Sequence, residues 1–311
     1  MVTSTSSGGN APAPVQTQTQ NAPNTPAQQP HFTIVPFKKL LAHHFLKLIV
    51  YGKYGAGKTT FAGSAVDVPE MRDVIMISAE AGETSLDDSP VVKDSEFLDV
   101  IRINKFSQLS YIRDFLEAHI IFRDNENEEK LRALQQRVFG AGTEAGEGRL
   151  RKYKTVIIDS LSEIDAYCMA ALLGIHEGFS WNADMPAAEF KEYKQNFNKM
   201  QMLIRGFRDL KMNVLFTCAA VYDKDEMQKM HFMPNLTGKL SNVVQGFFDV
   251  VGFLDTGSAT EDKDAPRRLW LQPVGGRFDA KTRLAGYKKS FLDNPTMSSL
   301  YQAAQLAKKS G

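Results

Sequence analysis

The stretch YGKYGAGKTT, residues 51 to 60, follows the short apolar run FLKLIVYG, residues 45 to 52, and precedes a segment that can form a helix. Residues 52 to 59 match the pattern GxxxxGK[ST] at every fixed position. In this pattern glycines let backbone N–H groups surround an anion, the lysine reaches the β- and γ-phosphates, and the hydroxyl binds Mg²⁺. We therefore predict a strand, a phosphate-binding loop and a helix that starts near Lys58 with its positive dipole end at the phosphates.

The match of residues 52 to 59 to this pattern predicts which residues contact the nucleotide. Lys58 has a second, catalytic role because its charge meets the charge of the transferring phosphoryl group, and Thr59 is a metal ligand. The predicted nucleotide-binding residues are Gly52, Lys53, Tyr54, Gly55, Ala56, Gly57, Lys58, Thr59 and Thr60.

A second apolar run, TVIID at residues 155 to 159, ends in a carboxylate. An Asp that follows a strand often caps a helix. In proteins with a phosphate loop, however, an acid on a neighbouring parallel strand holds part of the Mg²⁺ shell. We therefore predict that Asp159 is a metal ligand together with Thr59.

The remaining sequence alternates apolar runs of strand length with segments of helical spacing. This alternation predicts an α/β fold with a mainly parallel central sheet flanked by helices on both faces. Residues 267 to 274 are expected to form one arm of a C-terminal β-hairpin. The other expected strands are 45 to 52, 74 to 80, 97 to 103, 154 to 160, 212 to 221 and 247 to 254, and the longest expected helix is 107 to 122.

Residues 1 to 30 contain no Asp, Glu, Lys or Arg and almost no large apolar side chain. Such a segment buries too little surface to offset the entropy of ordering, so we predict a disordered tail. The predicted globular core spans residues 31 to 295, and residues 296 to 311 form a C-terminal helix or tail.

Bulk composition limits the kinds of partner. The 37 Lys and Arg residues nearly balance 36 Asp and Glu residues, so any site for a polyanion has to be local. Cys168 and Cys218 lack metal-ligand spacing and are expected to be reduced core thiols. No apolar run approaches the roughly 20 residues of a membrane helix, and no leader pattern is found, which predicts a soluble cytoplasmic protein.

Four segments in order resemble the RecA family: MISAEAGETSL (76 to 86), YKTVIIDSLSEI (153 to 164), the stretch from Met212 to Asp255, and RRLWLQPVGGRFDAKTR (267 to 283). Together with PNLTGK (234 to 239), they look most like the short RecA-like ATPases of bacteriophages that promote single-strand annealing. The resemblance covers residues 38 to 290. It implies ATP and Mg²⁺ as cofactors and Glu80 as the general base that polarises the attacking water. If the protein is phage-encoded, its place is the host cytoplasm.

The resemblance also implies a single-stranded DNA partner and a homo-oligomeric ring or filament. The connection 222 to 238 combines aromatic and basic residues, which suit base stacking and phosphate contact. It also holds acids that repel phosphate, so a plain surface loop remains the alternative. Trp181 is a secondary stacking candidate, with a buried anchor as the alternative. The candidate DNA contacts are Tyr222, Lys224, Lys229, His231, Phe232 and Lys239.

Lys281 and Arg283 lie in the segment similar to the RecA hairpin that reaches the neighbouring subunit's phosphates. In a head-to-tail assembly they would act in trans, whereas in a monomer they would be solvated charges. The sequence departs from RecA where RecA has a Gln that links nucleotide to DNA. It reads TCAAVYD there, with Thr217 as a weak substitute.

Three functions remain open at this point. The first is a DNA-dependent ATPase acting in recombination or annealing, for which a single-strand-binding protein is a further candidate partner. The second is a nucleotide kinase with an arginine-rich lid, for which the candidate side chains are Arg132, Arg137, Arg149 and Arg151. The third is a scaffold that binds ATP without hydrolysing it.

Overall fold

A computed structural model describes residues 45–87, 89–140, 148–175, 182, 184–224, 228, 230–256, 266–284, 287 and 289–309. Four parts of the predictions lie outside the described residues: the tail (1 to 30), the first part of the predicted core (31 to 44), Trp181 and Lys229.

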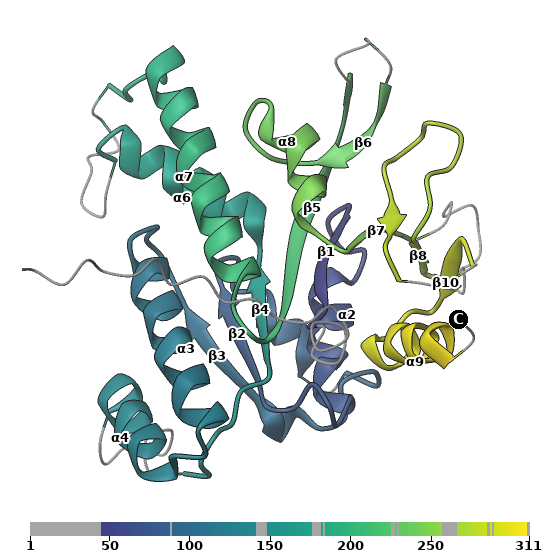
Figure 1. The fold of residues 1–311 in the computed structure, drawn as a ribbon. Coiled ribbons are helices and arrows are strands. Elements are labelled where there is room, and N and C mark those ends of the chain that lie inside the picture. Colours follow the sequence, from purple (N-terminus) through teal and green to yellow (C-terminus); the bar gives the residue numbers. More distant parts are fainter. Residues whose placement is uncertain are drawn as a thin grey trace, which may run out of the picture. The chain divides into compact units, whose positions relative to one another are not determined.

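The described residues form a ten-stranded sheet whose main path is β10-β8-β7-β1-β5-β4-β2-β3 (Figure 1). Every neighbouring pair from β3 to β7 along this path is parallel. The strands of the main path are β1 (Lys47–Gly52), β2 (Val74–Ser78), β3 (Leu98–Arg102), β4 (Thr155–Asp159), β5 (Asn213–Lys224), β7 (Val250–Asp255), β8 (Arg268–Trp270) and β10 (Phe291–Asp293). Two further strands pair at its side, β6 (Met230–Pro234) with β5 and β9 (Lys281–Thr282) with β7.

Helices cover both faces of the sheet, which explains why its central strands are apolar on both sides. All residues of β2 and β4 are buried. On β1, Leu48 and Val50 belong to the core beside α2 and α9, whereas Ile49 and Tyr51 belong to the core beside α3, α6 and α7. The α-helices are α2 (Lys58–Gly63), α3 (Gln108–Asp124), α4 (Glu128–Phe139), α6 (Leu161–Leu172), α7 (Phe190–Arg208), α8 (Leu240–Val243) and α9 (Met297–Lys309). The predicted mixed α/β fold class is therefore confirmed.

Short 3₁₀ segments lie between the main helices and strands. The helix expected from Lys58 to about Val66 is α-helical only to Gly63 and continues as the 3₁₀ segment η1 (Ser64–Asp67). The other such segments are η2 (Gly82–Leu86), η3 (Ser95–Phe97) and η4 (Val244–Phe247). The start of α9 is tied to η1, because the Met297 backbone N–H donates to Ser64 Oγ at 2.8 Å.

The C-terminal strands are arranged along β7. β8 pairs antiparallel with the second half of β7, where Phe253 faces Trp270, and β10 pairs antiparallel with β8. β9 pairs antiparallel with the first half of β7, where Val250 faces Thr282. β8 and β9, the two strands within residues 267 to 283, therefore both pair with β7 and not with each other. Within the described part of the chain, no helix has both the length and the apolar composition needed to span a membrane.

Candidate active site

The loop between β1 and α2 has the backbone geometry that its glycines predict. Gly55 and Gly57 have φ angles of +74° and +92°, in the region that side chains other than glycine rarely adopt. A Cβ at Gly52 would stand 2.4 Å from the Leu254 carbonyl oxygen, so β1 and β7 can approach closely only with glycine there. Lys53, Tyr54 and Gly55 are exposed at the tip of the loop.

Lys58 is buried at the first turn of α2, with 7% of its surface exposed. Its Nζ donates to the carbonyl oxygens of Gly52, at 3.1 Å, and of Lys53, at 3.0 Å. Burial lowers the pKa of Lys58, and the nearby carboxylates of Glu80 and Asp159 oppose this shift. The ammonium is therefore held against the loop backbone, close to the predicted general base Glu80 and the predicted metal ligand Asp159.

Asp159, at the end of β4, accepts hydrogen bonds from two threonines. Thr59 Oγ1 donates to Asp159 Oδ2 at 2.9 Å, and Thr217 of β5 donates to Oδ1. Burial raises the pKa of Asp159, while the bonds from Thr217 and Thr59 counter part of this rise. A hydroxyl and a carboxylate oxygen at this distance are the hard donors that Mg²⁺ prefers, so the pair Thr59 and Asp159 fits a magnesium ion.

Glu80 lies two residues beyond the end of β2. The last residue of β2, Ser78, pairs with Asp159 of β4. The Glu80 side chain is exposed, and Oε1 accepts a hydrogen bond from Ser160 Oγ. The turn after Glu80 lies close to Thr59 and Asp159, because a Cβ at Gly82 would lie 3.5 Å from Thr59 Oγ1. Glu80 therefore lies at the same edge of the sheet as the phosphate loop.

A second carboxylate, Glu83, is bound differently from Glu80. Ser78 Oγ donates to Glu83 at 2.6 Å, and Arg102 forms an ion pair with it. Burial alone would raise the pKa of Glu83, but these hydrogen bonds outweigh it and lower the pKa. Sequence reasoning did not identify Ser160 or Glu83; Ser160 directly follows Asp159 and Glu83 lies three residues after Glu80, which is the signal that was available.

The candidate DNA residues differ in exposure: some are exposed to solvent, and others are buried or partly buried. Residues 220–224 of β5 and 230–234 of β6 pair as a two-stranded arm, which we call the β5–β6 arm, and it continues past the end of β1 (Figure 1). Tyr222 on this arm is 55% exposed, and Lys224 and Lys239 are exposed too. His231, by contrast, is buried and lies 3.4 Å from Asp279. The prediction of His231 as a direct DNA contact therefore needs correction, since an inward-facing ring cannot reach a phosphate.

Phe232 is partly buried. Its ring packs between Tyr222, at 4.8 Å between centroids, and Phe253, at 5.3 Å. Lys53 Nζ of the phosphate loop lies 5.0 Å from the same ring centroid. Phe232 thus joins the β5–β6 arm to the phosphate loop.

Lys281 and Arg283 lie beside the first half of β7. Lys281 pairs with Val251, and the Arg283 backbone N–H donates to the Asp249 carbonyl at 2.8 Å. Burial lowers the pKa of Lys281, and Arg283 adds to this shift. The phosphate loop follows the other end of β1, level with Leu254, so these two cations do not meet the loop of their own chain.

The arginines considered for a kinase lid lie far from the loop along the strands. Arg149 pairs with Asp73, directly before β2, and Arg151 pairs with Asp99 near the start of β3. Arg132 and Arg137 lie on α4, at the edge of the sheet opposite the β5–β6 arm (Figure 1). This placement does not bring the four arginines to the phosphate loop.

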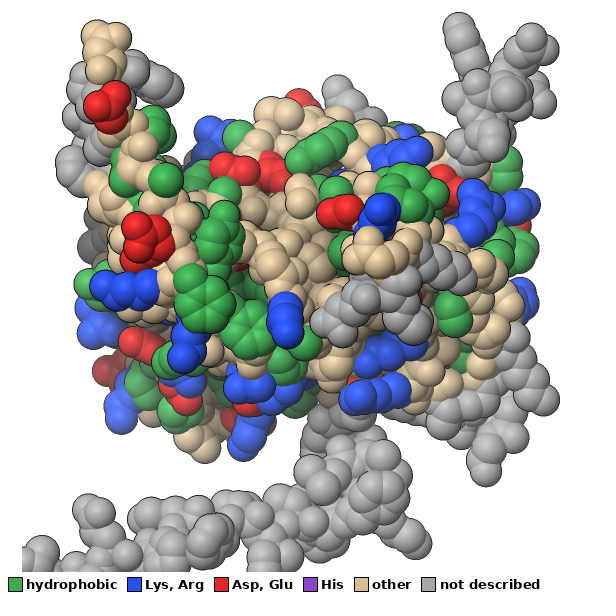
Figure 2. Space-filling view, turned by 90° about the horizontal axis from the view of Figure 1, so that it is seen from above, with side chains coloured by type: hydrophobic (Ala, Val, Ile, Leu, Met, Phe, Trp, Pro, Cys, Tyr) green, Lys and Arg blue, Asp and Glu red, His purple; other side chains and the backbone are tan. Residues whose placement is uncertain are grey.

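The face from which the β5–β6 arm projects carries mixed charges. Figure 2 shows Lys and Arg side chains interspersed with acidic and hydrophobic ones on this face, and not collected in one field. This distribution agrees with a formal net charge of +1.

Comparison with known proteins identifies the family. No curated protein matches the sequence. Among solved structures, the chain is similar to a RadB recombinase at 13% identity and a TM-score of 0.34, covering 77% of this chain and 87% of that one. A family model described as an AAA domain, AAA_24, matches residues 44–284, which include the phosphate loop, Glu80 and Asp159. The chain therefore belongs to the AAA_24 family and is a P-loop ATPase.

Proposed function

We propose that this protein is a RecA-like ATPase that hydrolyses ATP and acts on single-stranded DNA in recombination or strand annealing of the phage type. The observation that carries this proposal is the 2.9 Å contact between Thr59 Oγ1 and Asp159 Oδ2. It joins the first turn of α2 to the end of β4, beside a loop whose glycines have the required backbone angles.

Each residue of the loop then has a defined part in binding. Backbone N–H groups of residues 53 to 59 surround the phosphates, and Lys58 exchanges the carbonyls of Gly52 and Lys53 for phosphate oxygens. Thr59 and Asp159 hold Mg²⁺, which neutralises charge on the phosphates when bound. Thr217 orients the Asp159 carboxylate from β5.

Glu80 is the proposed general base. Its exposed carboxylate is reachable by water, and the bond from Ser160 fixes its direction. Water attacks the γ-phosphorus, the bond between this phosphorus and the bridging oxygen breaks, and Glu80 accepts the proton of the water. ADP and inorganic phosphate leave.

The DNA part of the proposal rests on the β5–β6 arm and its neighbourhood. Tyr222 offers an aromatic face, and Lys224 and Lys239 offer positive charge near it. Lys229 remains a proposed contact from the sequence, and Trp181 remains a secondary stacking candidate with a buried anchor as its alternative. A multimer in which Lys281 and Arg283 act on the adjacent subunit's nucleotide, and a single-strand-binding protein as partner, are parts of the same proposal.

ATP turnover measured with and without single-stranded DNA tests this function. We expect DNA to stimulate wild-type turnover, and Glu80→Gln to lower it about 100-fold or more while ATP still binds. Lys58→Ala should lose ATP binding itself. Wild-type protein that binds ATP but shows no turnover under either condition would identify a scaffold instead, and turnover by Glu80→Gln equal to wild type would remove Glu80 from its role.

A further inference from the structure

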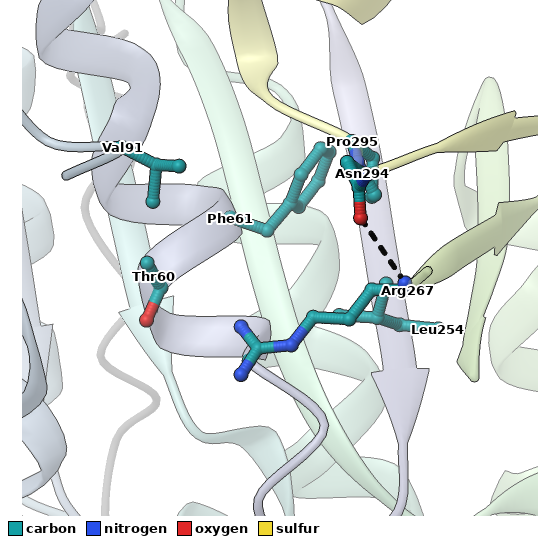
Figure 3. Close-up of a pocket in the computed structure, with 8 residues that line it drawn as sticks. Thr60, Phe61, Val91, Leu254, Arg267, Asn294 and Pro295 are labelled. Carbon is teal, nitrogen blue, oxygen red and sulfur yellow. Dashed lines mark hydrogen bonds between the residues drawn. The ribbon is translucent and has the colours of Figure 1, made fainter. Parts of the chain in front are cut away.

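A pocket of about 340 Å³ opens directly beside the phosphate loop (Figure 3). Gly57 and Thr60 of the loop and helix start form one part of its lining, so it is continuous with the phosphate site. Its volume lies in the range of about 300 to 1,000 Å³ typical of small-molecule sites. The pocket begins at Gly57 and Thr60, next to the loop that is proposed to bind the phosphates.

The walls of the pocket are mostly apolar. Phe61 of α2, Val91 from the connection after η2, Leu254 of β7 and Pro295 before α9 contribute to them. Flat apolar walls with few polar groups suit the faces of a nucleobase, whose binding removes both surfaces from water.

Arg267 is the charged side chain of this pocket, and it reaches the phosphate loop. Its Nη1 lies 2.5 Å from the position that a Cβ at Gly57 would occupy, so the guanidinium lies directly against the Gly57 backbone. In Figure 3 the guanidinium extends from the edge of β8 towards Thr60. The Arg267 side chain therefore lines the pocket and lies against the phosphate loop at Gly57.

The backbone of Arg267 is fixed by Asn294. The Arg267 N–H donates to Asn294 Oδ1 at 3.3 Å, and the Asn294 N–H donates to the Arg267 carbonyl at 2.7 Å. The adjacent Arg268 forms an ion pair with Asp293 at 2.7 Å and lies over the Phe291 ring. Arg267, in contrast, has no carboxylate partner among the residues that the structure describes.

We propose that this pocket binds the base and ribose of the nucleotide, and that Arg267 contacts this nucleoside part in cis. A guanidinium placed over a base face or against the ribose hydroxyls adds cation–π attraction or hydrogen bonds. The inference rests on the proposed ATP binding, and it gives β8 a direct part in that binding. Arg267 thereby differs from Lys281 and Arg283, which are proposed to act across a subunit interface.

Calorimetric titration of the full chain with two probes, ATP and inorganic tripolyphosphate, each with Mg²⁺, tests the proposal. Arg267→Gln should weaken ATP binding about tenfold, or about 1.4 kcal/mol, and change tripolyphosphate binding less than about threefold. Arg268→Gln is the matched control and should leave both affinities within about twofold. Val91→Trp, which fills the pocket from the opposite wall, should also weaken ATP selectively.

Three results would overturn the inference. Arg267→Gln could bind ATP as wild type does, could lose ATP and tripolyphosphate by the same factor, or could be matched by Arg268→Gln. Lys58→Ala separates this inference from the proposed function, because it should lose both probes. A wild-type chain that binds neither probe refutes both proposals, whereas Lys58-dependent binding of both without an ATP-selective effect of Arg267→Gln refutes this inference alone.

Discussion

At the scale of single residues, the two carboxylate oxygens of Asp159 have separate partners. Thr59 bonds one of them from α2, and Thr217 bonds the other from β5. The Thr59 bond occupies the side proposed for Mg²⁺. The Thr217 bond therefore sets the orientation of the carboxylate and connects it to the strand that becomes the β5–β6 arm.

Removing the Thr217 hydroxyl should slow the reaction. We expect Thr217→Val to lower ATP turnover at saturating single-stranded DNA about tenfold, because a hydrogen bond to a charged group contributes about 1.5 to 3 kcal/mol. Thr217→Ser keeps the hydroxyl and is the control, with turnover close to wild type. Equal turnover in the valine and serine variants would show that this bond has no part in hydrolysis.

His119 provides a test of stability against pH. Its ring is fully buried beside Phe115 and Tyr153, and neither ring nitrogen has a hydrogen-bond partner in the described residues. Burial lowers the pKa of His119 to about 3; Arg123 adds to this shift, and Asp73 and Asp124 oppose it.

Because the folded pKa of His119 lies below the unfolded value of about 6.5, the unfolded state takes up the proton first as the pH falls. Its contribution to stability is complete above pH 6.5 and is lost progressively towards pH 3, at about 1.4 kcal/mol per pH unit. In urea unfolding at pH 7.5 and 5.5, His119→Leu should lose about 1.4 kcal/mol less stability between the two pH values than wild type. An identical loss in both proteins would contradict this assignment.

At the scale of secondary structure elements, the sequence predicts what local patterns determine. The strand, loop and helix around Gly57 follow from adjacent residues, and the carboxylate after β4 follows from an apolar run that ends in Asp159. The positions of His231, Phe232 and Arg267 depend on β6, β7 and β8 coming together from distant parts of the chain. The periodicity of neighbouring residues does not carry that information, so the sequence did not indicate the burial of His231, the packing of Phe232 or the approach of Arg267 to the phosphate loop.

The β5–β6 arm carries a prediction of its own. Tyr222→Ala should weaken single-stranded DNA binding about tenfold, since base stacking on an aromatic side chain contributes about 1 to 3 kcal/mol per base. Met230→Ala removes an exposed apolar side chain from the partner strand and serves as the control. Fluorescence anisotropy with a labelled oligonucleotide measures both. Equal affinities of the two variants would exclude stacking on Tyr222.

At the scale of the whole molecule, the near balance of charge gives no global positive field, so each cation has to be placed locally at the nucleotide. Lys281 and Arg283 lie beside the first half of β7, away from the loop of their own chain. Their proposed role therefore requires a second subunit.

Mixing two inactive variants tests this requirement. Lys58→Ala lacks a functional loop but keeps both cations, whereas the double variant Lys281→Ala and Arg283→Ala has the reverse defect. In a head-to-tail assembly some interfaces combine an intact loop with intact cations, so the mixture should hydrolyse ATP faster than the sum of its components. A mixture of Lys58→Ala with Glu80→Gln, both defective in the same site, should show no gain. Absence of gain in the first mixture would contradict a trans role.

The contact of Lys53 with Phe232 links the phosphate loop to the β5–β6 arm. If ATP favours one position of the arm, it changes the affinity of the arm for DNA. This change is a coupling free energy between ATP and DNA, and it is the same in both directions. DNA that tightens ATP binding by a given factor must itself be bound more tightly by that same factor when ATP is present. Under the proposed function, nucleotide hydrolysis would change the affinity for single-stranded DNA without any contact between the two ligands.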